Sequence, residues 1–222
     1  MSRLTALLAA FVVLSLTALV FGGRGTSPSG ETYSPFAASA QEAAVDISGI
    51  EEMSQGNPDA PVTVIEYASF TCPHCEAFHA GPFKQLKANY IDTGKINFVY
   101  REVYFDRYGL WASMIARCAG TPEKFFGISD LIYDGQSEWV RAGEPAQIVE
   151  ELRKIGRLAG LDNDAMEACL QDGDKARTLV AWYESNAQAD GIDRTPSFVI
   201  NGKKYANMPY DEMAKLIDAA AE

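Results

Sequence analysis

The chain has 222 residues, with 19 Lys and Arg against 30 Asp and Glu, and it contains four Cys. This length suits one domain with an insertion, and a composition with 47% hydrophobic residues excludes a disordered chain. The net charge of −11 argues against nucleic acid as a partner, since phosphate-backbone binding needs a basic stripe. Four Cys are too few for a disulfide-dense scaffold, so a hydrophobic core must provide most of the stability.

Residues 1–40 are typical of a secretory signal peptide. Arg3 precedes an uncharged, apolar run over 4–21, and a Gly-, Ser-, Pro- and Ala-rich stretch then leads to a small-x-small site that ends at Ala40. The alternative is an N-terminal membrane anchor followed by a linker, because the 18 residues 4–21, at about 1.5 Å each, are just long enough to span a bilayer. Under both interpretations the domain formed by residues 41–222 is exported.

The first part of this domain predicts two strands on either side of a helix. After a polar lead-in over 45–60, the β-branched and apolar run over 62–70 is typical of a strand that is covered on both faces. A helical pattern follows as far as residue 90, and Gly81-Pro82 must kink or interrupt it because proline removes a backbone donor. Residues 95–103 predict the second strand.

A helical insertion and a closing β-β-α unit are predicted next. Apolar residues recur at helical spacing over about 107–190, and then 197–200 and 203–206, joined by Asn201-Gly202, predict a hairpin with a type I′ turn. A final helix presents Met213, Leu216, Ile217 and Ala220 on one face. The predicted order is that of an α/β fold, β-α-β, a helical block, then β-β-α.

The sequence Cys72-Pro73-His74-Cys75 lies between the first strand and the first helix. Pro73 suits the first helical turn, which places Cys72 at the helix N-terminus, where unpaired N–H groups and the helix dipole favour a thiolate. Such an environment lowers the pKa of a cysteine, and His74 adds to the effect when it is protonated. We therefore interpret Cys72 and Cys75 as a redox-active pair.

Other uses of this Cys pair are less favoured. A bridge between residues three apart closes a very short loop and removes little chain entropy, so it is a poor structural staple. A zinc site would need two further ligands, but His74 and His79 are the only histidines, and no metal site is predicted. Glu76 follows Cys75 where haem attachment needs a histidine, and thiol exchange itself needs no bound cofactor.

Glu66 is the one carboxylate within the predicted buried strand. Strand alternation places it on the same face as Val62, Val64 and Ala68, six residues before Cys72. A buried carboxylate is costly unless it has a task or a partner, so a role in moving the proton of Cys75 is one interpretation. The other is that the strand register differs and Glu66 is solvated.

Together these features resemble the DsbA-like thiol-disulfide oxidoreductases of the thioredoxin superfamily. The resemblance covers residues 58–222 and runs in order through VIEYASFTCPHC, INFVYRE, the helical insertion and DRTPSFVINGK. It implies a thioredoxin-like fold in which the catalytic residues are an exposed nucleophile, a buried resolving cysteine, a thiolate-stabilising histidine and a buried acid. In this sequence they are Cys72, Cys75, His74 and Glu66, in that order.

Thr195-Pro196 matches the family's substrate-binding loop, whose proline is cis and faces the active site. The best-known oxidase has Val where this chain has Thr195, and disulfide isomerases of the superfamily often have Thr. Thr195 therefore leaves open whether the chain acts mainly as an oxidase or as an isomerase. Against an isomerase, only about 20 residues separate Ala40 from the first strand, too few for the dimerisation domain of such isomerases.

Cys118 and Cys169 form the second cysteine pair, and both lie on apolar faces of the helical block. In an exported protein a disulfide between them is expected, and it resembles a second bridge found in a subset of DsbA-like proteins. The alternative is two buried free thiols, which behave as small hydrophobic side chains.

The function implied is that of a periplasmic enzyme that donates disulfides to reduced or unfolded secreted proteins. The family resemblance also implies a DsbB-like, quinone-linked membrane oxidase as the partner that restores the bridge. The alternatives are a disulfide isomerase or reductase of the same superfamily, and a redox-independent periplasmic chaperone or metal-binding module. Contact with a membrane is expected only through an N-terminal anchor at residues 4–21.

Overall fold

A mixed five-stranded sheet forms the centre of this computed structural model, which describes residues 45–222. Its spatial order is β1-β3-β2-β4-β5, in which β2 and β3 are parallel and the other neighbours are antiparallel. The strands are β1 (Met53–Gly56), β2 (Val62–Ala68), β3 (Ile96–Glu102), β4 (Ser197–Ile200) and β5 (Lys203–Ala206).

The signal peptide or anchor predicted for residues 1–40 lies outside the described residues. From residue 45 onward, no helix is both long and apolar enough to cross a membrane.

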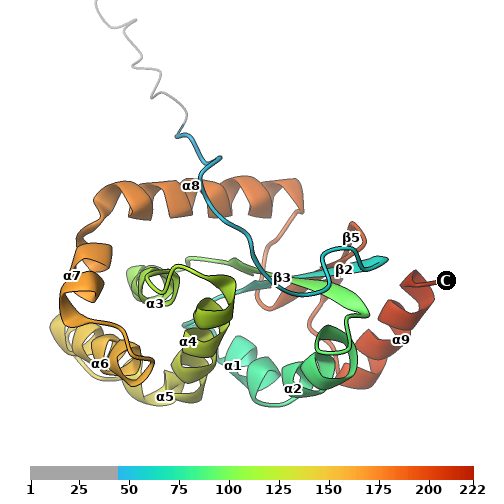
Figure 1. Cartoon of the computed structure of the whole chain (residues 1–222), viewed down its shortest axis with the longest axis horizontal. Helices are drawn as coiled ribbons and strands as arrows, with labels where there is room; N and C mark the ends of the chain where they lie inside the picture. Colours follow the sequence, from blue (N-terminus) through green and yellow to red (C-terminus); the bar gives the residue numbers. More distant parts are fainter. Residues whose placement is uncertain (1–44) are drawn as a thin grey trace, which may run out of the picture. The chain divides into compact units, whose positions relative to one another are not determined.

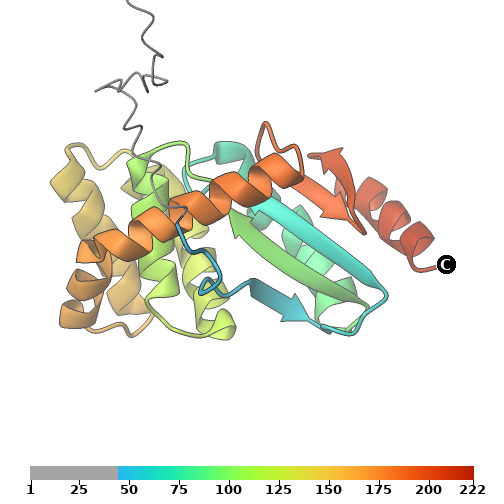
Figure 2. The ribbon, with the colours of Figure 1, turned by 90° about the horizontal axis from the view of Figure 1, so that it is seen from above.

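Helices cover both faces of the sheet (Figures 1 and 2). α8 crosses one face, whereas α1, α2 and α9 lie on the other, and α3 to α7 form a block beside the sheet. The helices are α1 (Pro73–Ala80), α2 (Pro82–Leu86), the π-helix η1 (Lys87–Ile91), α3 (Arg107–Arg117), α4 (Pro122–Asp134), α5 (Gln136–Trp139), α6 (Pro145–Leu158), α7 (Asn163–Gln171), α8 (Gly173–Ala189) and α9 (Tyr210–Ala220). The predicted α/β, thioredoxin-like fold with an inserted helical block is confirmed.

Local sequence accounts for most of these elements. The break between α1 and α2 falls at Gly81-Pro82, where the proline begins the second helix. Asn201 and Gly202, with φ of 44° and 82°, give the hairpin between β4 and β5 the two left-handed residues that a type I′ turn requires.

One strand is missing from the sequence-based prediction. β1 lies within the stretch interpreted as a polar lead-in, and it pairs antiparallel with β3 from Met53, opposite Tyr100, to Gly56, opposite Asn97. Only Met53 of its four residues is buried, so the segment has neither the apolar run nor the alternation of an interior strand. Its strand conformation comes from the hydrogen bonds that β3 offers at the edge of the sheet.

A buried ion pair joins the sheet to the helical insertion. The Arg117 guanidinium of α3 donates to both carboxylate oxygens of Glu102 on β3, with Nη2–Oε2 at 2.8 Å, and Ser113 Oγ donates to Oε1 at 2.9 Å. Because every oxygen of this buried acid has a donor, the pair fixes the orientation of α3 against the sheet.

A disulfide closes the insertion itself. Cys118, directly after α3, is bonded to Cys169 on α7, 51 residues further along the chain.

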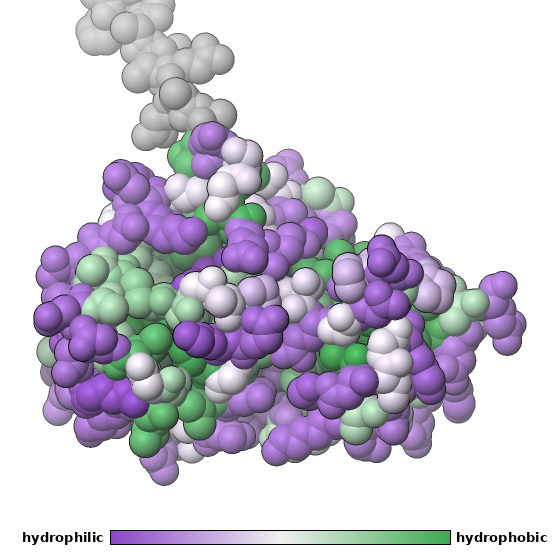
Figure 3. Space-filling view, in the orientation of Figure 1, coloured by the Kyte–Doolittle hydropathy of each residue, from purple (hydrophilic) through white to green (hydrophobic). Residues whose placement is uncertain are grey.

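On the face shown in Figure 3 the surface is mainly hydrophilic, with hydrophobic residues gathered over α5 and α6. The insertion is therefore held by the disulfide and the Glu102–Arg117 pair together with its own core.

We expect the Cys118–Cys169 bond to raise the free energy of unfolding by about 4 kcal/mol, because it shortens the unfolded chain by a loop of about 50 residues. Urea unfolding of a C72A/C75A variant, with this bond intact and with it reduced, measures the effect without interference from the other thiols. Equal stability of the two forms would contradict a structural role for the bond.

Candidate active site

Cys72 lies at the junction between β2 and α1. It is the N-cap residue of α1 and has extended backbone angles (φ −85°, ψ 119°), while Pro73 begins the helix. Its carbonyl oxygen accepts hydrogen bonds from the N–H groups of Cys75 and Glu76, each at 3.1 Å. The predicted placement of the sulfur at the positive end of a helix is therefore the geometry observed.

The two cysteines differ sharply in exposure. Both are free thiols in this structure, and Cys72 is partly exposed, whereas Cys75 has no solvent-accessible surface. A large reagent can thus reach only the first sulfur. The structure represents the dithiol form, which a disulfide donor has after it has given up its bridge.

The pKa of Cys72 is lowered to about 5. The largest cause is the hydrogen bond from the Cys75 thiol, followed among the favourable contributions by Thr195 and by the backbone N–H groups of Cys75 and His74. Partial burial of the sulfur opposes them. At neutral pH the sulfur of Cys72 is therefore a thiolate in the dithiol form.

The pKa of Cys75 moves in the opposite direction and lies well above the usual thiol range. Burial is the largest cause, and the hydrogen bond to Cys72 and the negative charge of Glu66 add to it. Cys75 therefore stays protonated, and it is the donor in the hydrogen bond between the two sulfurs.

The loop at Thr195-Pro196 lies against Cys72 although it is far away in the sequence. The peptide bond between the two residues is cis, and the Cys72 thiol, when protonated, donates to the Thr195 carbonyl oxygen at 3.5 Å. Pro196 is buried and β4 begins at the next residue. The sheet thus brings Cys72 and the predicted substrate-binding loop together.

His74 is exposed, and its contribution to the lowered pKa of Cys72 comes through its backbone N–H. Its side chain lines a hollow of about 320 Å³ beside the active-site helix. The remaining lining residues come from α1, from the start of α2 and from the segment before α9: Ala77, Phe78, Pro82, Asn207, Met208 and Pro209.

Glu66 is fully buried, as the predicted strand register requires, and it has a partner that the sequence reasoning missed. His79 Nε2 lies 3.2 Å and 3.1 Å from the two carboxylate oxygens of Glu66. From sequence, His79 is considered only as a zinc ligand. The available signal was its spacing, because a residue four positions after Cys75 shares its face of the helix.

Two further contacts were not predictable from local sequence. The Gln136 side chain of α5 is buried and donates to the carbonyl oxygens of Phe70 and Cys72 at 2.9 Å and 3.0 Å. Thr71 Oγ1 donates to the Asp106 carboxylate at 2.8 Å, and the same carboxylate caps α3. The helical insertion therefore holds the loop that carries the nucleophile.

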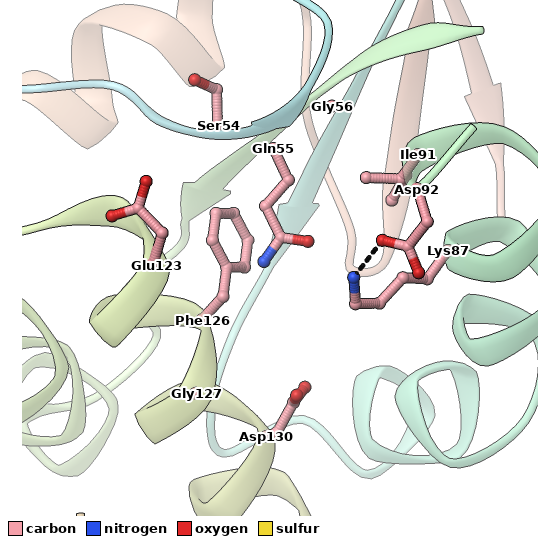
Figure 4. Close-up of a pocket in the computed structure, with 10 residues that line it drawn as sticks. All are labelled: Ser54, Gln55, Gly56, Lys87, Ile91, Asp92, Glu123, Phe126, Gly127 and Asp130. Carbon is pink, nitrogen blue, oxygen red and sulfur yellow. Dashed lines mark hydrogen bonds and ion pairs between the residues drawn. The ribbon is translucent and has the colours of Figure 1, made fainter. Parts of the chain in front are cut away.

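A larger hollow lies away from the cysteines (Figure 4). It has a volume of about 570 Å³ and its walls come from β1, η1 and α4, with Asp130 and Phe126 on the α4 side. None of its lining residues contributes to the environment of Cys72 described above, so size alone does not identify the reactive site.

We expect the thiolate absorbance of the reduced protein at 240 nm to titrate with a midpoint near pH 5. The Cys72→Ser variant should lack this transition, and Cys75→Ala should shift it to higher pH because the main hydrogen-bond donor is gone. Since the unfolded state binds more protons between about pH 5 and about 8.5, the stability of the dithiol form relative to Cys72→Ser should rise with pH over this window. An unchanged midpoint in Cys75→Ala would contradict the assigned cause.

Comparisons with known proteins agree with this geometry. A curated relative from Rickettsia bellii, named as a protein-disulfide oxidoreductase, is 35% identical over 171 residues, which are 77% of this chain and 65% of the relative. Disulfide bond formation protein D of Bacillus subtilis is 27% identical over 177 residues, covering 73% of this chain and 74% of that protein. The chain spans only 60% to 65% of the length of the Rickettsia relatives it matches.

Solved structures and a family model complete the comparison. Alpha-DsbA1 of Wolbachia pipientis superposes with a TM-score of 0.71 at 28% identity, covering 77% of this chain and 91% of that one. The family model for thioredoxin matches residues 48–219. The resemblance to DsbA-like proteins predicted from sequence is confirmed, and the chain belongs to the thioredoxin family.

Proposed function

We propose that this protein is an exported thiol:disulfide oxidoreductase that donates disulfides to other proteins through Cys72 and Cys75. The observation that carries this proposal is that the pKa values of the two thiols shift in opposite directions in the dithiol form. The pKa of Cys72 is lowered to about 5 and that of Cys75 is raised. A reduced form stabilised in this way makes the corresponding disulfide a stronger oxidant.

The reaction transfers two electrons from the substrate to the enzyme. A substrate thiolate attacks the Cys72 sulfur of the Cys72–Cys75 disulfide, forming a mixed disulfide and expelling Cys75, which takes up a proton. A second substrate thiolate then attacks the substrate sulfur of the mixed disulfide and expels Cys72 as a thiolate. The substrate leaves with a new disulfide, and the enzyme remains as the dithiol described above.

The surroundings of Cys72 suit a polypeptide substrate. The Thr195 carbonyl lies beside the Cys72 sulfur, and residues of the same helix that follows Cys72 line the hollow at His74. An extended segment of a reduced protein would place its backbone along the Thr195-Pro196 loop and a side chain in this hollow. In this proposal His74 helps to stabilise the thiolate by its backbone N–H and contacts the substrate with its side chain.

An oxidising compartment agrees with the second cysteine pair. The Cys118–Cys169 bond is of a kind that persists outside the reducing cytosol. Together with the signal-like sequence of residues 1–40, it supports a periplasmic location. In this proposal the segment is either cleaved after export or kept as a membrane anchor. The partner that restores the Cys72–Cys75 bridge would be a DsbB-like, quinone-linked membrane oxidase.

A second candidate function is isomerisation or reduction of disulfides. Thr195 is the observation that favours it, because the residue before the cis proline lies against the Cys72 sulfur and is the position at which oxidases and isomerases of the superfamily differ. The mechanism would use the same two cysteines, starting from the dithiol.

The reduction potential of the Cys72–Cys75 couple separates these functions. We expect a value nearer to about −120 mV than to thioredoxin's about −270 mV, measured by equilibration with glutathione. A value at or below the thioredoxin level would contradict disulfide donation. Cys72→Ser should abolish oxidation of a reduced test protein, whereas the C118S/C169S variant, which loses two cysteines outside the site, should retain it.

A further inference from the structure

Side chains of the helical insertion hold the backbone of the loop between β2 and α1. Tyr133 Oη, on α4, donates to the carbonyl oxygen of Ser69 at 3.3 Å. Gln136 Nε2, on α5, donates to the carbonyl oxygens of Phe70 and Cys72 at 2.9 Å and 3.0 Å. The loop that carries the nucleophile therefore has backbone acceptors that are satisfied from another part of the fold.

Gln136 holds this loop on both sides of Thr71. Its amide nitrogen carries two hydrogen atoms, and its two hydrogen bonds go to the residue two positions before Cys72 and to Cys72 itself. Gln136 is 6% exposed, so water does not compete readily for these bonds. The whole donor capacity of the amide nitrogen is thus used on the segment that ends at the nucleophile.

The first turn of α1 depends on contacts from outside the helix. Cys72 is its N-cap residue, but the Cys72 side chain makes no capping hydrogen bond among the described residues. The polar side chains usually found at this position fasten the first turn themselves. With eight residues, α1 is also too short to be stable in isolation. The contact from Gln136 reaches the backbone of the cap residue and so restrains the start of the helix.

The two redox forms depend on this restraint to different degrees. In the disulfide form a covalent bond joins Cys72 to Cys75 and fixes the first turn of α1. In the dithiol form that bond is absent, and the hydrogen bond from Cys75 to Cys72 takes its place. A hydrogen bond weakens steeply when its distance or angle changes. A contact that keeps the first turn in place therefore stabilises the dithiol form more than the disulfide form.

We propose that Gln136 is a positioning residue that makes the Cys72–Cys75 disulfide a stronger oxidant by holding the loop of the dithiol form. This inference rests on the proposed function, in which these two cysteines are the redox couple. A contact that stabilises the dithiol over the disulfide raises the reduction potential of the couple. Through α5, the helical insertion thus takes part in setting the chemistry of a cysteine pair that lies outside it.

Gln136 is the contact through which this effect can be tested separately. Asp106 accepts a hydrogen bond from Thr71 Oγ1, but the same carboxylate also caps α3. Tyr133 also bonds to Tyr100 in the core. Substitution of either residue would disturb more than the loop, whereas both hydrogen bonds of Gln136 Nε2 go to the loop itself.

The test compares the full chain with its Gln136→Met variant, which keeps the length of the side chain and removes both donors. Each protein, with Cys118–Cys169 intact, is equilibrated with glutathione, so that the enzyme dithiol and glutathione disulfide form the enzyme disulfide and two molecules of glutathione thiol. We expect the equilibrium constant in this direction to rise about tenfold, because unmet buried acceptors destabilise the dithiol form. The potential then becomes about 30 mV more negative. An unchanged equilibrium constant would overturn the proposal.

Leu152→Ala is the control that separates positioning from a general loss of stability. Leu152 lies on α6 and is fully buried, so its truncation leaves a cavity in the core of the insertion. We expect it to lower the free energy of unfolding in urea equally for both redox forms and to leave the glutathione equilibrium unchanged. Gln136→Met should destabilise the dithiol form more than the disulfide form. Equal losses in the two forms of Gln136→Met, or an equal shift of the equilibrium in Leu152→Ala, would overturn the proposal.

A measurement on the unaltered protein applies if Gln136→Met does not fold. In the dithiol form the side-chain amide protons of Gln136, followed by NMR, should exchange with solvent at least about tenfold more slowly than those of Gln188, which is exposed on α8. Exchange as fast as that of Gln188 would overturn the proposal. Failure of the wild-type Cys72–Cys75 pair to exchange with glutathione would instead contradict the proposed function, so the two failures are distinguishable.

Discussion

The hydrogen bond from Cys75 to Cys72 is the interaction on which the chemistry of this site depends. It is the largest cause of the lowered pKa of Cys72, and it requires one sulfur at the surface and the other in the core. The first turn of α1 achieves this because residues three apart lie about one turn apart, one at the helix end and one on its buried face. Burial of Cys75 keeps its proton in place, so the same arrangement that withholds one thiol from solvent activates the other.

This junction is short, and distant parts of the chain hold it in position. Thr195 comes from the loop before β4, Gln136 from α5 and Asp106 from the start of α3, and each contacts Cys72 or a residue beside it. Two of these three belong to the helical insertion. The insertion is therefore more than an added subdomain, because it supplies donors and acceptors for a loop that the sheet alone would leave exposed. The Cys118–Cys169 bond and the Glu102–Arg117 pair stabilise the body from which these contacts come.

The parts of this arrangement that could be predicted from sequence are those in which local pattern and tertiary environment agree. The apolar run of β2, the Asn201-Gly202 turn and the helix start at Pro73 each carry their own signal. β1 has no such signal, because its pairing with β3 and not its composition makes it a strand. Gln136 could not be identified as a site residue for a related reason, because a polar residue on a helix acquires its role from the group it meets. The spacing of His79 indicates only that it shares a helix face with Cys75 and does not identify Glu66 as its partner.

Glu66 and Glu102 show how the partner decides what a buried acid can do. Both lie near the carboxyl ends of the parallel strands β2 and β3, and both are essentially inaccessible to solvent. Glu102 is paired with Arg117, whose guanidinium does not lose its proton, so that carboxylate is held in one charge state and serves the structure. Glu66 is paired with His79, and imidazole is the side chain that gains and loses a proton most readily near neutral pH. Of the two acids, the one whose charge acts on Cys75 is therefore the one whose partner is not a permanent cation.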